Sequence, residues 1–206
     1  MPDVQPDSAE TAGLLERVER GDPDALDGLL RRHRPDLRSF VETHLDPRLR
    51  ARVDPSDVVQ DAQLEAARRM PDYLERRPMP FRLWLRKNAY ERLLNLRRDH
   101  TRARRSVGRE EALPDRSSLL LAGPLLGGAS TPSRQAAARE RAERVARAVG
   151  RLGEADREVL LMRHAEKLPY DEIACLLDIE AAAARKRYGR ALIRLQRALR
   201  EEGLLE

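Results

Sequence analysis

The sequence predicts an all-α protein of two small helical domains joined by a flexible linker, and three observations lead to this. Apolar residues recur at intervals of three and four along most of the chain, as they do on one face of a helix. No stretch stands out with the alternating pattern of a strand. Residues 106–133 break the periodicity, since they hold seven Gly or Pro residues among 28 and few charges, a composition typical of a linker. An apolar patch at 119–126 within this linker suits packing on a domain or on a partner.

The N-terminal domain, residues 10–105, is expected to follow a disordered tail, residues 1–9, and to contain four helices. The first begins near Glu10, where the apolar spacing becomes helical. Asp22 can cap the second helix, with a proline in the next position. Pro35 then either bends this second helix or divides it in two.

Two further helices are predicted in the same domain. The third extends from about Pro55 to Met70, and the fourth from about Phe81 to Arg98 or beyond, because each has apolar residues on one helical face. The proline-flanked residues 71–80 between them are expected to form a loop.

The C-terminal domain, residues 134–206, is expected to hold helices at about 133–149 and 154–164, followed by a helix-turn-helix. A short helix after Pro169 and a longer basic helix are separated by a break at 178–180. The basic helix has an apolar stripe at intervals of three and four, made of Ala184, Tyr188, Ala191, Leu192, Leu195 and Leu199.

Basic residues crowd the opposite face of that last helix. The segment 185–200 holds seven basic residues and no acidic one. A solvated helix surface usually mixes both signs, because like charges one turn apart repel each other. A helix-turn-helix whose second helix has a bare cationic face is suited to the major groove of DNA, so DNA contact is favoured over a merely solvated face.

Charge is segregated along the rest of the chain too. The net charge is only +5, from 40 basic and 35 acidic residues, yet residues 54–65 hold four acidic residues and no basic one. Residues 82–105 hold nine basic residues and two acidic ones. This arrangement predicts one acidic contact surface and two cationic ones.

Several classes of protein are not expected. The single cysteine, Cys175, permits no disulfide framework and points to a reducing compartment. No apolar segment reaches the ~18–20 residues of a membrane span, and the polar, acidic start of the chain is unlike a signal peptide, so a cytosolic protein is expected. The four histidines lack metal-ligand spacing, and no nucleotide-binding glycine loop or nucleophile arrangement appears. Neither an enzyme nor a cofactor or metal site is therefore expected.

Four stretches, at residues 20–26, 54–61, 81–89 and 152–200, are similar to segments of one known family. They come in the same order as in that family and with similar spacing between them. With them the chain resembles the sigma-70 family of RNA polymerase sigma factors, specifically its small extracytoplasmic-function (ECF)-like group. The resemblance implies core RNA polymerase and promoter DNA as partners and promoter recognition at transcription initiation as the function. It also admits an anti-sigma protein as a further partner.

The resemblance implies that the third helix docks on a basic and polar coiled coil of the polymerase. Complementary charge would steer that encounter. The residues expected to make the contact have no basic neighbour in the local sequence, and Asp57 alternatively caps its own helix. They are Asp57, Gln60, Asp61 and Leu64.

The fourth helix and the loop before it are expected to contact the minus-ten promoter element. Holding a melted strand requires phosphate contacts and a place for an extruded base, so an aromatic ring in the loop either stacks on that base or packs in the core. Glu91 stands where the family usually has Asn, and a carboxylate facing DNA is unfavourable. The expected contacts are Tyr73, Arg86, Lys87, Arg92, Asn95, Arg97 and Arg98.

The last helix is expected to contact the minus-thirty-five element. The family often has Gly-Thr-Val where this chain has three alanines, which can touch thymine methyl groups or let the backbone approach. The expected contacts are Ala182, Ala183, Arg185, Lys186, Arg187 and Arg190. A second hypothesis is a stand-alone helix-turn-helix regulator that does not bind polymerase, but it leaves the acidic helix and the basic helix after it unexplained.

Overall fold

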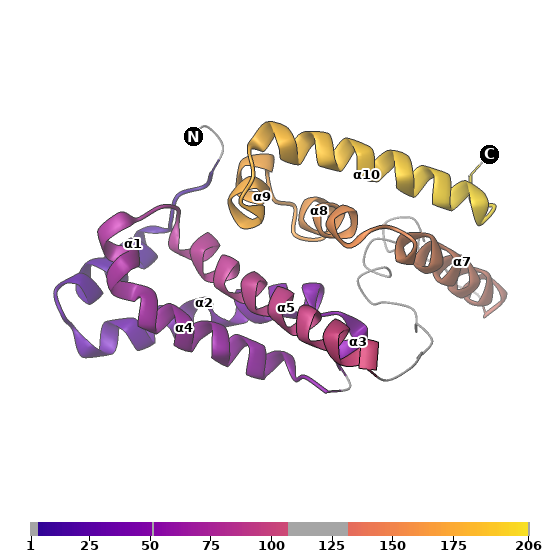
Figure 1. Ribbon diagram of the computed structural model, residues 1–206. Helices are drawn as coiled ribbons and strands as arrows, with labels where there is room; N and C mark the ends of the chain where they lie inside the picture. Colours follow the sequence, from indigo (N-terminus) through magenta and orange to yellow (C-terminus); the bar gives the residue numbers. More distant parts are fainter. Residues whose placement is uncertain (1–3, 51, 107–131, 206) are drawn as a thin grey trace. The chain divides into compact units, whose positions relative to one another are not determined.

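Within residues 4–50, 52–106 and 132–205, which are those that the computed structural model describes, every regular element is a helix (Figure 1). The predicted all-α class is therefore confirmed. The described residues form two compact units, the first built mainly from α1 to α5 and the second mainly from α7 to α10. Nearly all of the predicted linker, with its apolar patch, lies outside the described residues. Among the described helices, none is both long enough and apolar enough to cross a membrane.

In the first unit, α2 is the central helix, since it packs on α1, α4 and α5, and α4 also packs along α5 (Figure 1). The core lies between these helices, where the side chains of Leu29, Phe40, Phe81 and Leu93 are fully buried. The helices of this unit are α1 (Ala9–Glu19), α2 (Pro23–His44), α3 (Pro47–Arg50), α4 (Pro55–Arg76) and α5 (Phe81–Ser106).

Helix α2 begins as its sequence predicts. The carboxylate of Asp22 accepts the backbone N–H of Asp24 at 3.0 Å, and Pro23 occupies the first helical position. The helix then continues through Pro35 to its end, so the alternative in which Pro35 divides it is wrong. Pro35 lies on the exposed face, where water can satisfy the carbonyl group that proline leaves without its usual partner.

Helix α4 is longer than predicted, because it continues past Pro71 to Arg76. Tyr73, in this extra turn, is only 3% exposed. Truncating a buried aromatic side chain typically costs about 3–5 kcal/mol, which matches or exceeds the roughly 3 kcal/mol that an interior proline costs. The predicted loop at 71–80 is therefore wrong in extent, and residues 77–80 alone connect α4 to α5.

The described part of the N-terminal tail also differs from the prediction of disorder. Ser8 caps α1, with its hydroxyl oxygen 3.3 Å from the backbone nitrogen of Thr11. The carboxylate of Asp7 accepts the backbone N–H of Phe81 at the start of α5. A polar, acidic composition suggested a free tail, whereas these polar side chains are used as helix caps.

The second unit contains α7 (Pro132–Gly150), α8 (Glu154–His164), α9 (Tyr170–Leu177) and α10 (Ala181–Glu201). The range of α8 agrees with its prediction. Helix α10 packs on both α7 and α8 (Figure 1). The turn between α9 and α10 uses Asp178 in the left-handed conformation at φ 56°, and the backbone N–H of Ile179 closes it on the carbonyl of Ala174 at 3.1 Å. The predicted helix-turn-helix is present.

The apolar stripe of α10 differs from its prediction at one position. Ala184, Ala191 and Leu199 are buried as expected. Leu192 is 38% exposed, and Ala198 is buried at the far end of the stripe. The buried positions advance by seven residues, or two helical turns, from one alanine to the next, so the contact line passes beside Leu192.

Candidate nucleic-acid interface

One face of α4 presents the four residues expected to contact polymerase. Asp57, Gln60, Asp61 and Leu64 are all exposed, and their spacing of three and four places them on one side of the helix. Leu64 is 52% exposed, so its apolar side chain is available to a partner at this surface. The face therefore combines carboxylates, an amide and one apolar group, which together can make both polar and apolar contacts.

Capping of α4 is carried out by another residue. The carboxylate of Asp54 accepts the backbone N–H of Ser56 at 2.7 Å. Hydrogen bonds from the backbone and the side chain of Ser56 hold the pKa of Asp54 below its ordinary value. The side chain of Asp57 is thereby left exposed in the first turn, where its negative charge interacts favourably with the positive end of the helix dipole.

The acidic face has no basic neighbour in the local sequence, but the fold places a distant one beside it. The guanidinium of Arg92 on α5 lies 2.9 Å from the Asp61 carboxylate. Beside this pair, Arg69 of α4 lies 2.7 Å from Glu65 and 3.4 Å from Glu91. The Glu91 carboxylate, which was expected to oppose DNA, is therefore partly neutralised. These pairs join α4 to α5 along an exposed seam.

The six basic and amide residues expected on α5 are not equivalent. Asn95 and Arg98 are exposed, whereas Arg86, Lys87, Arg92 and Arg97 are half-buried. The guanidinium of Arg86 lies over the Phe40 ring at 5.7 Å, and that of Arg97 donates to the carbonyl of His44. Partly buried guanidinium groups held by such contacts keep their charge and have less freedom to reorient.

Tyr73 does not have a free ring with which to stack on a base. Its ring packs against Trp84 with centroids 4.5 Å apart and meets the edge of Phe81 at 5.6 Å. Its hydroxyl donates to the carbonyl of Met79 at 3.1 Å, and burial raises its pKa. The structure thus corrects the expectation of a base contact in favour of the core-packing alternative.

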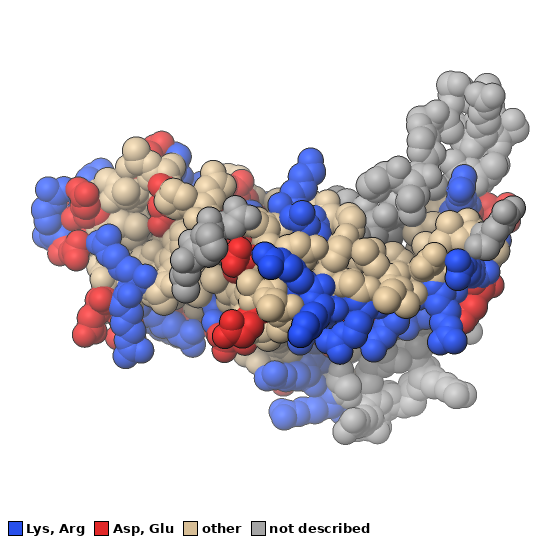
Figure 2. All heavy atoms as spheres, turned by 90° about the horizontal axis from the view of Figure 1, so that it is seen from above, with Lys and Arg blue, Asp and Glu red and all other residues tan. Residues whose placement is uncertain are grey.

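The first half of α10 carries an exposed cationic surface. Ala182, Arg185, Lys186 and Arg190 are exposed, with Ala183 and Arg187 half-buried beside them. Figure 2 looks down on this helix and shows Lys and Arg side chains along one side of it. Within the described residues, none of Lys186, Arg187 and Arg190 has an ion-pair partner. The first turn holds no acidic residue and no side-chain cap, and the exposed Glu180 precedes it at the N-cap position.

Arg185 is oriented by an aromatic ring. Its guanidinium lies 5.6 Å from the centroid of Tyr170 at the start of α9, and the same ring has Arg163 at 5.0 Å. Tyr170 in turn meets the edge of Tyr188 on α10 at 5.7 Å. Burial raises the pKa of Tyr188, with Tyr170 contributing in the same direction. These contacts fix the two helices of the motif against each other.

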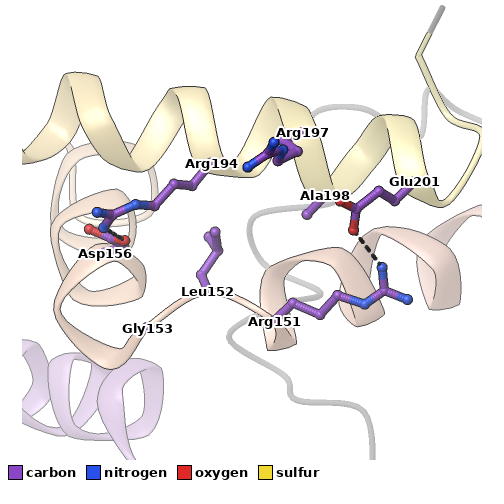
Figure 3. A pocket seen from close by; sticks show the side chains of 8 residues that line it. All are labelled: Arg151, Leu152, Gly153, Asp156, Arg194, Arg197, Ala198 and Glu201. Atoms are coloured by element: carbon purple, nitrogen blue, oxygen red, sulfur yellow. Dashed lines mark hydrogen bonds and ion pairs between the residues drawn. The ribbon is translucent and has the colours of Figure 1, made fainter.

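The second half of α10 uses its arginines differently. Arg194 lies 2.5 Å from the buried carboxylate of Asp156 at the start of α8, so its charge is neutralised within the unit. At the end of α10, Glu201 is paired with Arg151, which directly follows α7, at 3.1 Å, and both residues line an open pocket of about 330 Å³ (Figure 3). The predicted cationic face is therefore unpaired near the start of α10 and partly paired near its end.

Sequence reasoning missed the residues that hold these surfaces in place. The Arg69–Glu91 pair, the Asp156–Arg194 pair and the Asp7 cap all join segments far apart in the sequence. A local signal existed for one of them, because Asp156 lies in the first turn of a helix where a carboxylate is favoured. That signal predicts a cap and gives no indication of an ion pair with α10.

Comparisons with known proteins agree on one family. A family model described as Sigma-70, region 4, matches residues 142–200. The RNA polymerase sigma factor CnrH of Cupriavidus metallidurans is 30% identical over 196 residues, covering 95% of this chain and 97% of that protein. The ECF RNA polymerase sigma-E factor of Escherichia coli is 28% identical over 182 residues, covering 86% of this chain and 88% of that protein.

Two solved structures have a similar fold. The structure of CnrH in complex with the cytosolic domain of CnrY has a TM-score of 0.58 at 24% identity and covers 94% of this chain and 99% of that one. The sigma factor RpoE in complex with the anti-sigma factor NepR from Bartonella quintana has a TM-score of 0.55 at 18% identity, with 86% and 98% covered. Because most of the chain is covered, the similarity of fold extends to both helical units.

Proposed function

The chain belongs to the sigma-70 family of RNA polymerase sigma factors, in its ECF-like group, and from this premise we propose that it binds core RNA polymerase and directs it to promoters. The function is one of binding, and it assigns no catalytic step to the chain. The observation that carries the proposal is the separation of charge: exposed carboxylates on α4 in one unit, and unpaired basic side chains on α10 in the other.

We further propose a division of labour between the domains. Residues 10–105 form the region-two domain that contacts polymerase and the minus-ten element, and residues 134–206 form the region-four domain that contacts the minus-thirty-five element. Residues 106–133 link them. The division is supported by the acidic stripe of α4, the basic surface of α10 and the break in helical periodicity between the domains.

The residues proposed for each contact are those that the sequence and the family resemblance predict, with one correction from the structure. On α4, the polymerase contact is assigned to Asp57, Gln60, Asp61 and Leu64. On α5, the minus-ten contact is assigned to Arg86, Lys87, Arg92, Asn95, Arg97 and Arg98, without Tyr73. On α10, the minus-thirty-five contact is assigned to Ala182, Ala183, Arg185, Lys186, Arg187 and Arg190.

Regulation by a protein partner is part of the proposal. One of the two solved relatives was captured with the cytosolic domain of CnrY and the other with an anti-sigma factor. By analogy, an anti-sigma protein is proposed to bind this chain and withhold it from polymerase. The site of action is the cytosol, where polymerase and promoter DNA are found.

Co-purification with core RNA polymerase tests the function against the stand-alone alternative. The chain is mixed with core enzyme lacking its own specificity subunit, and the mixture is separated by size. A stable complex is expected, and it should be weakened by Asp61→Arg, which reverses a charge in the proposed contact. DNA binding by the chain together with failure to enter a complex with core enzyme would instead favour the stand-alone regulator.

A further inference from the structure

The segment before α1 makes contacts that none of the surfaces described above accounts for. The carboxylate of Asp7 accepts the backbone N–H of Phe81 at 2.8 Å and lies 3.4 Å from the backbone nitrogen of Arg82. The guanidinium of Arg82 donates in turn to the carbonyl of Gln5 at 3.1 Å. A residue 74 positions away along the chain therefore caps α5.

Helix α5 has no local residue that could serve as its cap. None of residues 78–80 has a side-chain oxygen, and the carbonyl of Pro80 is used by later N–H groups of the helix. The N–H groups of Phe81 and Arg82 consequently have no acceptor within α5. Phe81 is fully buried, and a buried N–H group without a partner is unfavourable. Asp7 supplies the acceptor for both.

The short loop that leads into α5 is held at two other points. Arg77, in the left-handed conformation at φ 36°, lies 2.9 Å from Glu19 of α1. The hydroxyl of Tyr73 donates to the carbonyl of Met79 at 3.1 Å. The first contact comes from α1 and the second from α4, and Asp7 holds the chain at the residue where α5 begins.

We propose that Asp7 is a positioning residue for DNA binding by α5. By capping the helix it holds the first two turns, which carry Arg86 and Lys87, in a fixed orientation. Without the carboxylate, these turns fray and the two basic side chains lose their common geometry. The inference rests on the proposed function, since it takes α5 to be a helix that contacts promoter DNA.

Two substitutions of Asp7 and one control separate the cap from the charge. Asp7→Ala removes both the acceptor and the charge, whereas Asp7→Asn keeps an oxygen acceptor, and asparagine caps helices as well as aspartate does. Asp36→Ala removes a charge from an exposed position on α2 and serves as the control. In the free full-length protein, amide hydrogen exchange at Phe81 and Arg82 should accelerate about fivefold to thirtyfold in Asp7→Ala. It should change little in the other two variants.

The same proteins are then tested for initiation with core polymerase on a promoter selected with the unsubstituted chain. Asp7→Ala should initiate about fivefold less or worse, and Asp7→Asn should restore most of the activity. Faster exchange with unchanged initiation would overturn the positioning role, as would a gain in initiation, which would mean that Asp7 shields the helix from DNA. Should Asp7→Ala fail to fold, a large loss of initiation in folded Asp7→Asn would also overturn the positioning role, because that variant keeps the cap. Failure of the unsubstituted chain to initiate would refute the proposed function alone, because the exchange experiment still tests the cap.

Discussion

Asp61 offers a way to separate the stability of the fold from the binding of polymerase. Its side chain is 46% exposed and lies 2.9 Å from Arg92, which is 41% exposed. Exposed ion pairs contribute about 0.2–1 kcal/mol, so Asp61→Ala should lower the free energy of unfolding by no more than about 1 kcal/mol. A hydrogen bond to a charged group contributes about 1.5–3 kcal/mol. Asp61→Ala removes the hydrogen bond that its carboxylate is proposed to accept from polymerase, so it should weaken core polymerase binding about tenfold to a hundredfold.

Arg92→Ala is the matched control, because it breaks the same ion pair and leaves the Asp61 carboxylate available. Urea denaturation measures the stability of each variant, and the anisotropy of the labelled chain during titration with core polymerase, without DNA, measures binding. We expect the two variants to be about equally stable. Binding by Arg92→Ala should be unchanged or up to about fivefold tighter. Equal weakening of binding by both substitutions would refute the reasoning, since the ion pair itself would then be what matters.

Three further predictions concern α10, its contact with α8 and the N-terminal unit. Arg190→Ala should lower the salt slope of binding to the minus-thirty-five element by about one, as one phosphate contact is lost; an unchanged slope in gel-shift titrations would contradict this. Asp156→Ala should destabilise the C-terminal unit by about 1–3 kcal/mol, because it leaves Arg194 without its partner and removes a carboxylate from the start of α8; calorimetry would show a lower midpoint. Burial lowers the pKa of His33 below its ordinary value of 6.5, with the nearby Asp7 charge opposing the shift. The imidazole of His33 therefore takes up a proton at a higher pH in the unfolded chain than in the folded one. The stability that neutral His33 contributes to the fold is complete above pH 6.5 and declines as the pH falls through that value. Denaturation at several pH values should show this slope, and His33→Gln should reduce it.

The helices were predictable where the apolar spacing agrees with a capping or helix-breaking signal. Asp22 with Pro23 marks the start of α2, and the range of α8 matches its prediction. Helix α4 shows the limit of local rules. Pro71 signals an end, but burial of Tyr73 two residues later outweighs it, and that burial depends on the position of α5.

The candidate surfaces were predictable only in part. The exposed stripe on α4 and the basic start of α10 follow from helical spacing, which needs no knowledge of the fold. The pairing of Asp61 with Arg92, 31 positions away, and of Arg194 with Asp156, 38 positions away, depends on how the helices pack. Sequence reasoning therefore located the charges but did not show which of them are neutralised.

Run-off transcription with core RNA polymerase on a promoter library measures whether the chain directs initiation at specific promoters. We expect the chain, added to core enzyme lacking its own specificity subunit, to yield defined transcripts from a subset of templates that share two upstream elements. Transcripts should diminish when Asp61 or Arg190 is reversed in charge. Absence of specific transcripts under conditions where a known sigma factor supports them would show that the chain does not direct initiation.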